Sequence, residues 1–249
     1  MKPLTEDTPG VRPASRLAES AYETIRTKVL QRELPGGALV VEIRMADRLG
    51  ISRTPMREAL ARLVGEGLLV RNGAGTFTVR RVIATEFFQS MKVRELLELE
   101  AVKLAIGRVR PERIERLRRR VVGISDADRQ EAIHWAVDDE LHLLFAEASG
   151  NAVLAKLVRN ARITTRLFEI VSPFQRVRED AEEHLEILDA FSRDRRRATC
   201  EAMLRHLRNL EAAVASALTG GPLMEPGATP RGNHRERHAQ GRATRVPPP

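Results

Sequence analysis

The chain has 249 residues, a length typical of two ordinary domains, and 42% of them are hydrophobic, which is enough to form a packed core. A single cysteine excludes an internal disulfide and suits a reducing cytoplasm. Residues 1–14 lack the apolar stretch of a secretory signal, and no apolar run approaches the roughly 20 residues that cross a bilayer. We therefore expect a cytoplasmic protein, associated with the nucleoid if it binds DNA, and no membrane partner.

The net charge of +8 is unevenly distributed along the chain. Residues 1–82 carry 14 Lys and Arg against 9 Asp and Glu, residues 83–218 carry 23 of each, and residues 219–249 carry 5 against 2. A basic segment joined to a neutral one is typical of a nucleic-acid-binding unit attached to a second module. A solvated basic surface is the alternative that charge by itself leaves open.

The first helix is predicted over 16–31, where apolar residues recur at every fourth position. Pro35 and the two glycines after it end this helix, because proline cannot continue the backbone hydrogen-bond ladder. A short apolar run at 38–41 leads into a second short helix at 42–49. Gly50 ends that helix and begins a tight turn.

The third helix is predicted over 53–64, and the glycines at 65–67 end it. Two short strands follow at 68–70 and 76–79, on either side of a glycine-rich turn. Three helices and a hairpin in this order predict a winged helix-turn-helix domain over residues 15–82.

Beyond residue 82 the periodicity becomes helical throughout, without strand signals, and prolines and glycines mark the breaks. The pattern predicts an all-α helical bundle over 83–218, so the fold as a whole should be mainly α. Residues 1–14 and 219–249 are predicted to be a flexible N-terminus and a disordered tail, because both are polar and rich in proline. The six predicted helices of the bundle span 84–107, 111–122, 128–148, 151–171, 176–192 and 196–218.

The helix that begins at Arg53 has a basic arc opposite its apolar stripe. Met56, Leu60 and Leu63 share the stripe that should pack inward. Arg57 lies on the other arc, where a planar guanidinium can hydrogen-bond guanine or clamp a phosphate. Hydroxyls and free amides at the helix start can hold phosphates, and glycine in the wing lets the backbone approach a groove. The predicted DNA-contacting residues are Arg44, Ser52, Arg53, Thr54, Pro55, Arg57, Asn72 and Gly73.

A surface helix with solvated arginines is the alternative, but the preceding helix, the tight turn and the wing favour DNA binding. The sequences LPG at 34–36, RMADRLGISRTPMREAL at 44–60 and GEGL at 65–68 resemble the DNA-binding domain of GntR-family transcription regulators. The resemblance covers about residues 15–80. One departure is Arg44, since family members often carry an acidic residue there. Two such domains in a homodimer would recognise an inverted-repeat operator in double-stranded DNA.

Three histidines and an aspartate in the second half have the spacing of a metal site. Asp138 and His142 are four residues apart and share one helix face. His184 and His206 are 22 residues apart with a polar turn midway, so in an antiparallel hairpin they stand at the same height. Such ligands suit zinc, nickel, manganese or iron. Buried core histidines beside a surface acid are the alternative.

The sequences DDELH at 138–142, ASGN at 148–151, EHLEILDA at 183–190 and MLRHL at 203–207 resemble the FCD ligand-binding domain of FadR-type GntR regulators. This resemblance covers about residues 84–215, and the six predicted helices are similar to the VanR-like subgroup. It implies a divalent transition metal, zinc first, with nickel, manganese and iron left open. The implied ligands of this metal are Asp138, His142, His184 and His206.

The FCD resemblance also implies that the metal holds a small organic acid as effector. Arg94 matches an arginine on the first bundle helix that often faces the effector pocket, and its cation could grip a carboxylate at two points. An ion pair with Glu98, four residues on, explains Arg94 nearly as well.

These features predict a ligand-responsive transcription regulator, which we expect to be a repressor and not an enzyme. The competing hypothesis is a metal-dependent hydrolase, because three histidines and an aspartate could activate water at an open metal position. The chain lacks the HExxH motif, the nucleophile elbow and the phosphate-binding loop that would support it. A third hypothesis is a constitutive DNA-binding protein with a structural metal, whose operator binding no acid would alter.

Overall fold

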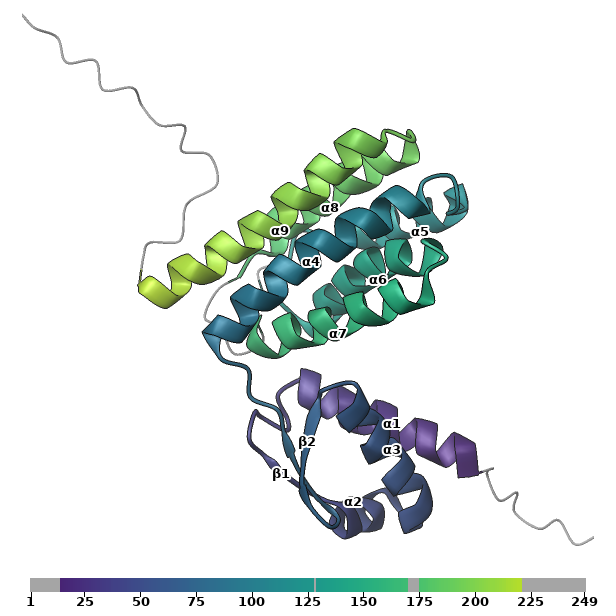
Figure 1. Ribbon diagram of the computed structural model, residues 1–249, viewed down its shortest axis with the longest axis vertical. Helices are drawn as coiled ribbons and strands as arrows, with labels where there is room; N and C mark the ends of the chain where they lie inside the picture. The colour runs from purple at the N-terminus through teal and green to yellow at the C-terminus, as the bar shows by residue number, and fades with distance from the viewer. Residues whose placement is uncertain (1–13, 128, 170–174, 221–249) are drawn as a thin grey trace, which may run out of the picture.

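The computed structural model of the chain describes residues 14–127, 129–169 and 175–220. An N-terminal unit of three helices and a small sheet lies beside a larger helical bundle (Figure 1). The predicted fold class, a winged helix-turn-helix followed by an all-α bundle, is confirmed. The predicted flexible N-terminus and disordered tail fall almost entirely outside the described residues. In the part of the chain that is described, no helix combines the length and apolarity needed to span a membrane.

The N-terminal unit has a three-stranded antiparallel sheet in the order β1-β3-β2. The apolar run at 38–41, left unassigned by the sequence, contains the whole of the edge strand β1, in which Leu39 pairs with Thr78 of β3. Such a short strand depends on its partner β3 and has no periodicity of its own. The elements of this unit are α1 (Ala14–Leu30), β1 (Leu39–Val41), α2 (Glu42–Leu49), α3 (Arg53–Gly65), β2 (Leu69–Gly73) and β3 (Thr76–Val79).

The turn between α2 and α3 follows the predicted chemistry. Gly50 closes α2 with φ 62° and ψ 35°, a left-handed conformation that costs glycine little. Ser52 occupies the N-cap position of α3, but its side chain makes no capping hydrogen bond. The Ser52 hydroxyl is therefore free for another partner at the start of the exposed helix.

The hydrophobic core of the N-terminal unit extends into the helical bundle. The predicted inward stripe of α3 is buried here, with Leu63 at 0% exposure. Ile163 and Leu167 of the bundle pack into the same core. Beside them, Arg80 Nη1 donates a hydrogen bond of 3.1 Å to Thr164 Oγ1. The two units are therefore joined by packed side chains as well as by the linker.

The six helices predicted for the bundle are confirmed within the described residues. The main difference is that α6 begins at Ala132, four residues after the predicted start, where Glu131 and His134 form a capping box. The predicted end of α7 at residue 171 lies outside the described residues. The helices are α4 (Ala84–Ala105), α5 (Pro111–Val122), α6 (Ala132–Ala148), α7 (Ala152–Glu169), α8 (Val177–Ser192) and α9 (Arg196–Thr219).

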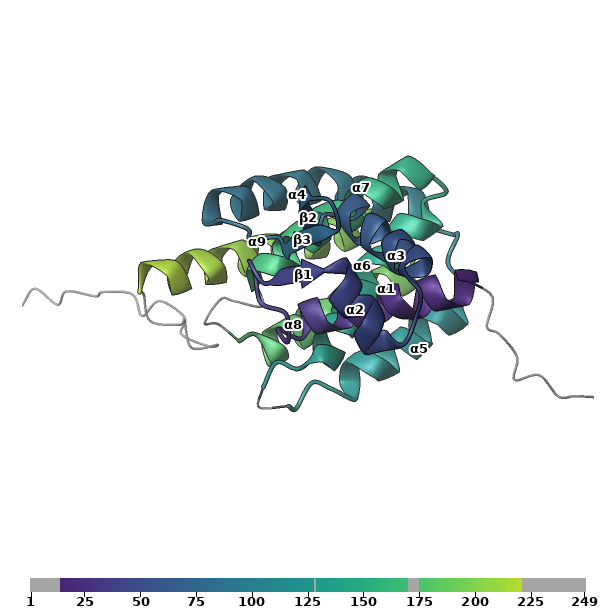
Figure 2. The same ribbon diagram turned by 90° about the horizontal axis from the view of Figure 1, so that it is seen from below.

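The long helix α4 packs against α6, α7 and α9, while α8 and α9 form an antiparallel hairpin. The view from below shows the N-terminal unit covering part of one side of the bundle, with α2 near the viewer (Figure 2). The bundle core is apolar along most of its length, with Phe87, Met91 and Leu141 at 0% exposure. Against this background, the buried histidines, arginines and acids of the bundle form a distinct polar cluster.

Candidate metal centre and nucleic-acid interface

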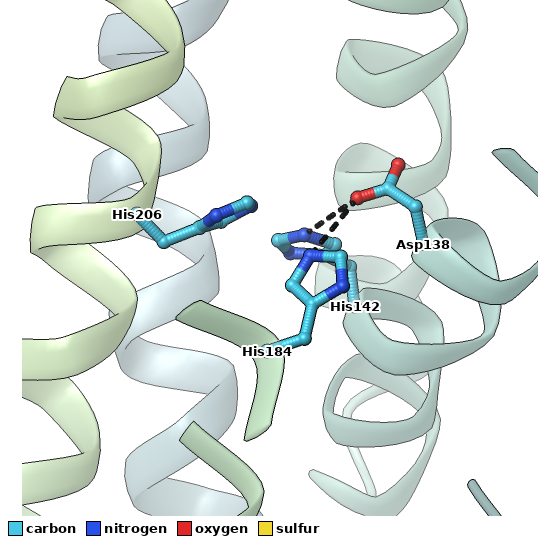
Figure 3. A group of neighbouring side chains, drawn as sticks. All are labelled: Asp138, His142, His184 and His206. Carbon is cyan, nitrogen blue, oxygen red and sulfur yellow. Dashed lines mark ion pairs between the residues drawn. The ribbon is translucent and has the colours of Figure 1, made fainter. Parts of the chain in front are cut away.

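Three helices bring the four predicted metal ligands to one point inside the bundle (Figure 3). Asp138 and His142 come from α6, His184 from α8 and His206 from α9, and one ligand atom of each lies within 4.8 Å of the others. The ring centroids of His184 and His206 are 4.7 Å apart, as equal distances from the hairpin turn would place them. The histidines are 1–3% exposed, while the side chain of Asp138 is 22% exposed, so the imidazoles are buried and the carboxylate lies at the edge of the cluster.

The Nε2 atoms of all three histidines are buried and make no hydrogen bond to any residue that the structure describes. Asp138 Oδ1 lies 3.3 Å from His142 Nε2 and 3.4 Å from His184 Nε2. Burying polar nitrogen without a partner is unfavourable, so three such atoms converging on a carboxylate need an explanation. A bound metal ion supplies one, because nitrogen and carboxylate oxygen are its usual ligands.

Two glutamates orient the histidine rings from the far side. Glu98 Oε2 contacts His142 Nδ1, and Glu183 Oε2 lies 2.7 Å from His206 Nδ1. Because each carboxylate engages Nδ1, the Nε2 atom points to the centre of the cluster, as in proteins whose metal-bound histidines are held by acids. Sequence reasoning missed both roles. Glu183 contacts a histidine on the neighbouring helix, which its position beside His184 does not indicate.

Asp138 divides its two oxygens between the histidines and two arginines. Its Oδ2 accepts hydrogen bonds of 2.7 Å from both Arg162 Nη2 and Arg166 Nη2. Burial raises the pKa of the Asp138 carboxyl, but the charge of Arg162 and the contacts with the histidines outweigh burial and hold the pKa well below its usual range. Asp138 is therefore an anion, with Oδ1 directed at the histidine nitrogens.

Burial lowers the pKa of His206 and its hydrogen bond with Glu183 raises it. Burial has the larger effect, so the pKa falls to about 3. A neutral imidazole is the form that binds a metal. Asp180, near His184, has its pKa raised by burial to about 7.

A cavity of about 20 Å³ adjoins His184 and Asp138, enough for about one water molecule. A larger ligand can enter there only if the surrounding helices move apart.

Arg94 forms the ion pair that its spacing from Glu98 predicts, and its side chain is buried. Its Nε donates a 2.6 Å hydrogen bond to Glu98 Oε1, and its Nη1 donates one of 3.1 Å to Thr165 Oγ1. The side chain is 2% exposed, and Nη2 has no hydrogen-bond partner among the described residues. Arg94 therefore contacts the glutamate that orients His142. Its buried Nη2 donor remains available to a ligand.

The DNA-facing surface, defined by the exposed side of α3 and the wing between β2 and β3, carries the predicted arginines. The side chains of Arg53 and Arg57 are 57% and 61% exposed. Both donate from Nε to Glu42 Oε1 at 2.9 Å. Glu42 was not among the predicted residues, since an acid in the first turn of a helix is expected from the helix dipole alone.

The remaining predicted DNA-contacting residues divide into exposed and buried positions. Arg44 is exposed and forms no ion pair with any described residue, and Asn72 and Gly73 are exposed on the wing. Pro55 is different, because its side chain is buried in the start of α3. Burial therefore argues against a DNA contact by Pro55, which has little surface accessible to a duplex. The other exposed residues of the predicted set are Ser52 and Thr54.

An exposed basic helix with a wing, joined to a bundle with a buried histidine and aspartate cluster, defines a ligand-responsive DNA-binding regulator of transcription. Residues 17–79 match the bacterial regulatory proteins of the gntR family, and residues 89–209 match the FCD domain. The chain belongs to the GntR family of transcription regulators. The recognition made from the sequence is thereby confirmed, and so is the expectation of a regulator and not an enzyme.

Individual relatives agree with this assignment. The chain is 32% identical to the Nta operon transcriptional regulator of Aminobacter aminovorans, over 69% of this chain and 82% of that protein. It is 26% identical to the putative L-lactate dehydrogenase operon regulatory protein of Escherichia coli K12, over 77% and 84% of the two chains. The solved structure of E. coli McbR/YncC has the same fold, with a TM-score of 0.68 at 22% identity over 81% of this chain and 98% of that one.

Proposed function

We propose that this regulator is a homodimeric repressor that leaves its operator when a small carboxylate binds to a metal ion in the bundle. The observation that carries the proposal is a cluster of three buried histidine Nε2 atoms around Asp138, none of which makes a hydrogen bond to a described residue. Nothing in the known chemistry of a purely structural core requires this arrangement. The operator would be an inverted repeat, because a twofold dimer presents two copies of α3 to the duplex.

The residues present fit a divalent transition metal. Three neutral imidazoles and one carboxylate form a nitrogen and oxygen ligand set, for which zinc is the first candidate and nickel, manganese and iron remain alternatives. The ion would supply a Lewis-acid anchor for one carboxylate oxygen of the effector. Arg94 supports the same role, since its buried Nη2 lacks a protein partner and could donate to an anionic ligand.

The helix α7 provides a route from this site to the DNA-binding unit. Arg162 and Arg166 on one face of α7 bind Asp138, while Ile163 and Leu167 on another face pack into the N-terminal core. A ligand that changes the charge around Asp138 therefore acts on a helix that also supports the DNA-binding unit. The effector can shift operator affinity only by favouring one arrangement of this helix over another.

The test is a gel-shift titration with the DNA upstream of the protein's own gene. Metal-loaded protein should bind this DNA, and one member of a panel of small carboxylic acids should release it. Chelating the metal should abolish the response to that acid. Binding that no acid alters would instead support a constitutive DNA-binding protein with a structural metal.

A further inference from the structure

A buried acid beneath the DNA-facing surface is unexpected, because a carboxylate close to this surface repels the phosphates of a duplex. Glu42 is 3% exposed at the start of α2 and lies beneath two arginines that reach the surface. Its Oε1 accepts from Arg53 Nε and from Arg57 Nε, and its Oε2 lies 3.0 Å from Arg57 Nε. One buried acid therefore holds both predicted recognition arginines.

The geometry determines which nitrogen atoms remain available. Both arginines use Nε to bind Glu42, and their terminal Nη1 and Nη2 atoms form no hydrogen bond to any described residue. A guanidinium held at Nε can still present its two terminal nitrogens, which match guanine O6 and N7. The bond with Glu42 already restricts the rotamers of each arginine, so less side-chain entropy is lost when DNA binds.

Glu42 is joined to the wing as well. Its backbone N–H donates a 3.0 Å hydrogen bond to Gly75 O. Gly75 has φ 69°, a left-handed conformation that glycine adopts more readily than other residues do. A Cβ atom at Gly75 would lie 3.7 Å from Glu42 Oε2, so the wing backbone passes directly over the carboxylate. A hollow of about 460 Å³ between α3 and the wing is lined by Glu42, Arg53 and Arg57 among others.

We propose that Glu42 is a specificity-determining positioning residue, which aims the terminal nitrogens of Arg53 and Arg57 at base edges and fixes the wing relative to α3. This inference rests on the proposed DNA contacts of the two arginines. It predicts that Glu42 contributes to sequence discrimination while it weakens attraction to DNA of any sequence. A residue needed only for folding would not have these opposite effects.

The test compares two duplexes, one selected by the wild-type chain from a random-sequence pool and one of unrelated sequence. In E42Q the shape of the side chain is kept and one negative charge is lost. Affinity for the selected duplex should fall about 10-fold, because the arginines lose their shared acceptor. Affinity for the unrelated duplex should stay equal or rise, because a repulsive charge has gone. The ratio of the two affinities should therefore fall about 10-fold or more.

E95Q is the matched control, because Glu95 is also a buried acid that pairs with two cations, Lys92 and Arg208, but lies in the bundle. Its affinity ratio should equal that of the wild type. If E42Q does not fold, E42D keeps the charge on a shorter side chain, so its ratio should fall with unchanged affinity for the unrelated duplex. Thermal unfolding of each variant checks that the folded state is compared.

Three results would overturn the inference. An E42Q or E42D protein with the wild-type ratio would show that the arginines need no positioning, although the proposed DNA contacts would stand. Equal losses on both duplexes would assign Glu42 to folding alone. A wild-type chain that selects no duplex from the pool would overturn the proposed DNA contacts together with this inference.

Discussion

The two halves of the molecule use the same ionic chemistry in opposite ways. On the DNA-facing surface, a buried carboxylate holds arginines that are 57% and 61% exposed, and their free nitrogens face outward. In the bundle, Arg94, Arg162 and Arg166 are only 2–4% exposed, and each has one buried nitrogen without a hydrogen-bond partner among the described residues. The first arrangement suits a large anionic partner that arrives from solvent. The second suits a small anion enclosed by protein.

The difference also explains which groups are left without partners. Glu42 accepts its hydrogen bonds from two arginines of the protein, whose side chains are largely exposed, so their outer nitrogens are accessible to solvent. The three histidine Nε2 atoms are buried and make no hydrogen bond within the described residues, so a bound ligand would satisfy them. In our proposals an acid therefore positions arginines in the N-terminal unit, while an acid in the bundle completes a binding site.

Removing a metal ligand should have the largest effect. For H206A we expect loss of the bound ion and of the stabilisation it provides, roughly 4 kcal/mol when free zinc exceeds its Kd about 1,000-fold. Thermal unfolding with and without added zinc, together with metal analysis of the purified protein, measures this. H134Q is the control, because His134 is buried on the same helix α6 but caps it and lies outside the cluster. Equal metal content in H206A and wild type would contradict the site.

Shortening an exposed arginine should have the next largest effect. For R57A we expect the selected duplex to bind more weakly by roughly 1–3 kcal/mol, with a smaller loss on unrelated DNA. Fluorescence anisotropy at fixed salt measures both affinities. R116A is the matched control, since Arg116 is an exposed arginine of the bundle without an ion pair in the described residues. An R57A protein that binds like R116A would remove Arg57 from the interface.

Weakening the packing between the two units tests whether they communicate. In L167A the contact of α7 with the N-terminal core is reduced, so the acid should alter DNA affinity less, by roughly 1–2 kcal/mol of coupling. The measurement is the DNA dissociation constant with and without the acid. L210A is the control, because Leu210 is similarly buried but lies in the bundle core. If L167A and L210A respond alike, α7 does not transmit the signal.

Much of this molecule could be predicted from local patterns. The helix from Arg53, its apolar stripe and the bundle helices follow from periodicity and turn residues, and hairpin symmetry brought His184 and His206 together. These features depend on residues close in sequence or on a single turn. The regular geometry of a helix or of a helical hairpin determines these features, so they can be predicted from the spacing of residues in the sequence.

The features missed at the candidate sites are mainly long-range contacts of charged side chains. Glu42 reaches arginines on the next helix, Glu98 contacts His142 on another helix, and Glu183 contacts His206 across the hairpin. No spacing rule distinguishes these acids from the many exposed acids of the chain, because their roles depend on how helices pack. The burial of Pro55 was missed for a different reason. Its position at a helix start could be predicted from the sequence, but whether that position is exposed could not.

The smallest predicted effect concerns how the stability of the metal-free bundle depends on pH, to which two side chains contribute with opposite signs. The pKa of His206 is lowered from 6.5 to about 3, so between these values the unfolded chain binds a proton that the folded chain does not. Acidification through this range therefore destabilises the fold through His206. The pKa of Asp180 is raised from 3.8 to about 7, so the folded chain holds a proton there and acidification from pH 7 to 4 stabilises the fold.

In the wild type these two effects should partly cancel, and single variants should separate them. In H206Q the free energy of unfolding should rise on acidification from pH 7 to 5 relative to wild type, and in D180N it should fall, each by roughly 1 kcal/mol per pH unit. Urea denaturation of chelator-treated protein at several pH values measures both slopes. Parallel slopes in the two variants would mean that neither group is held in its buried form. Opposite slopes would indicate that the bundle keeps the histidine neutral before any metal arrives.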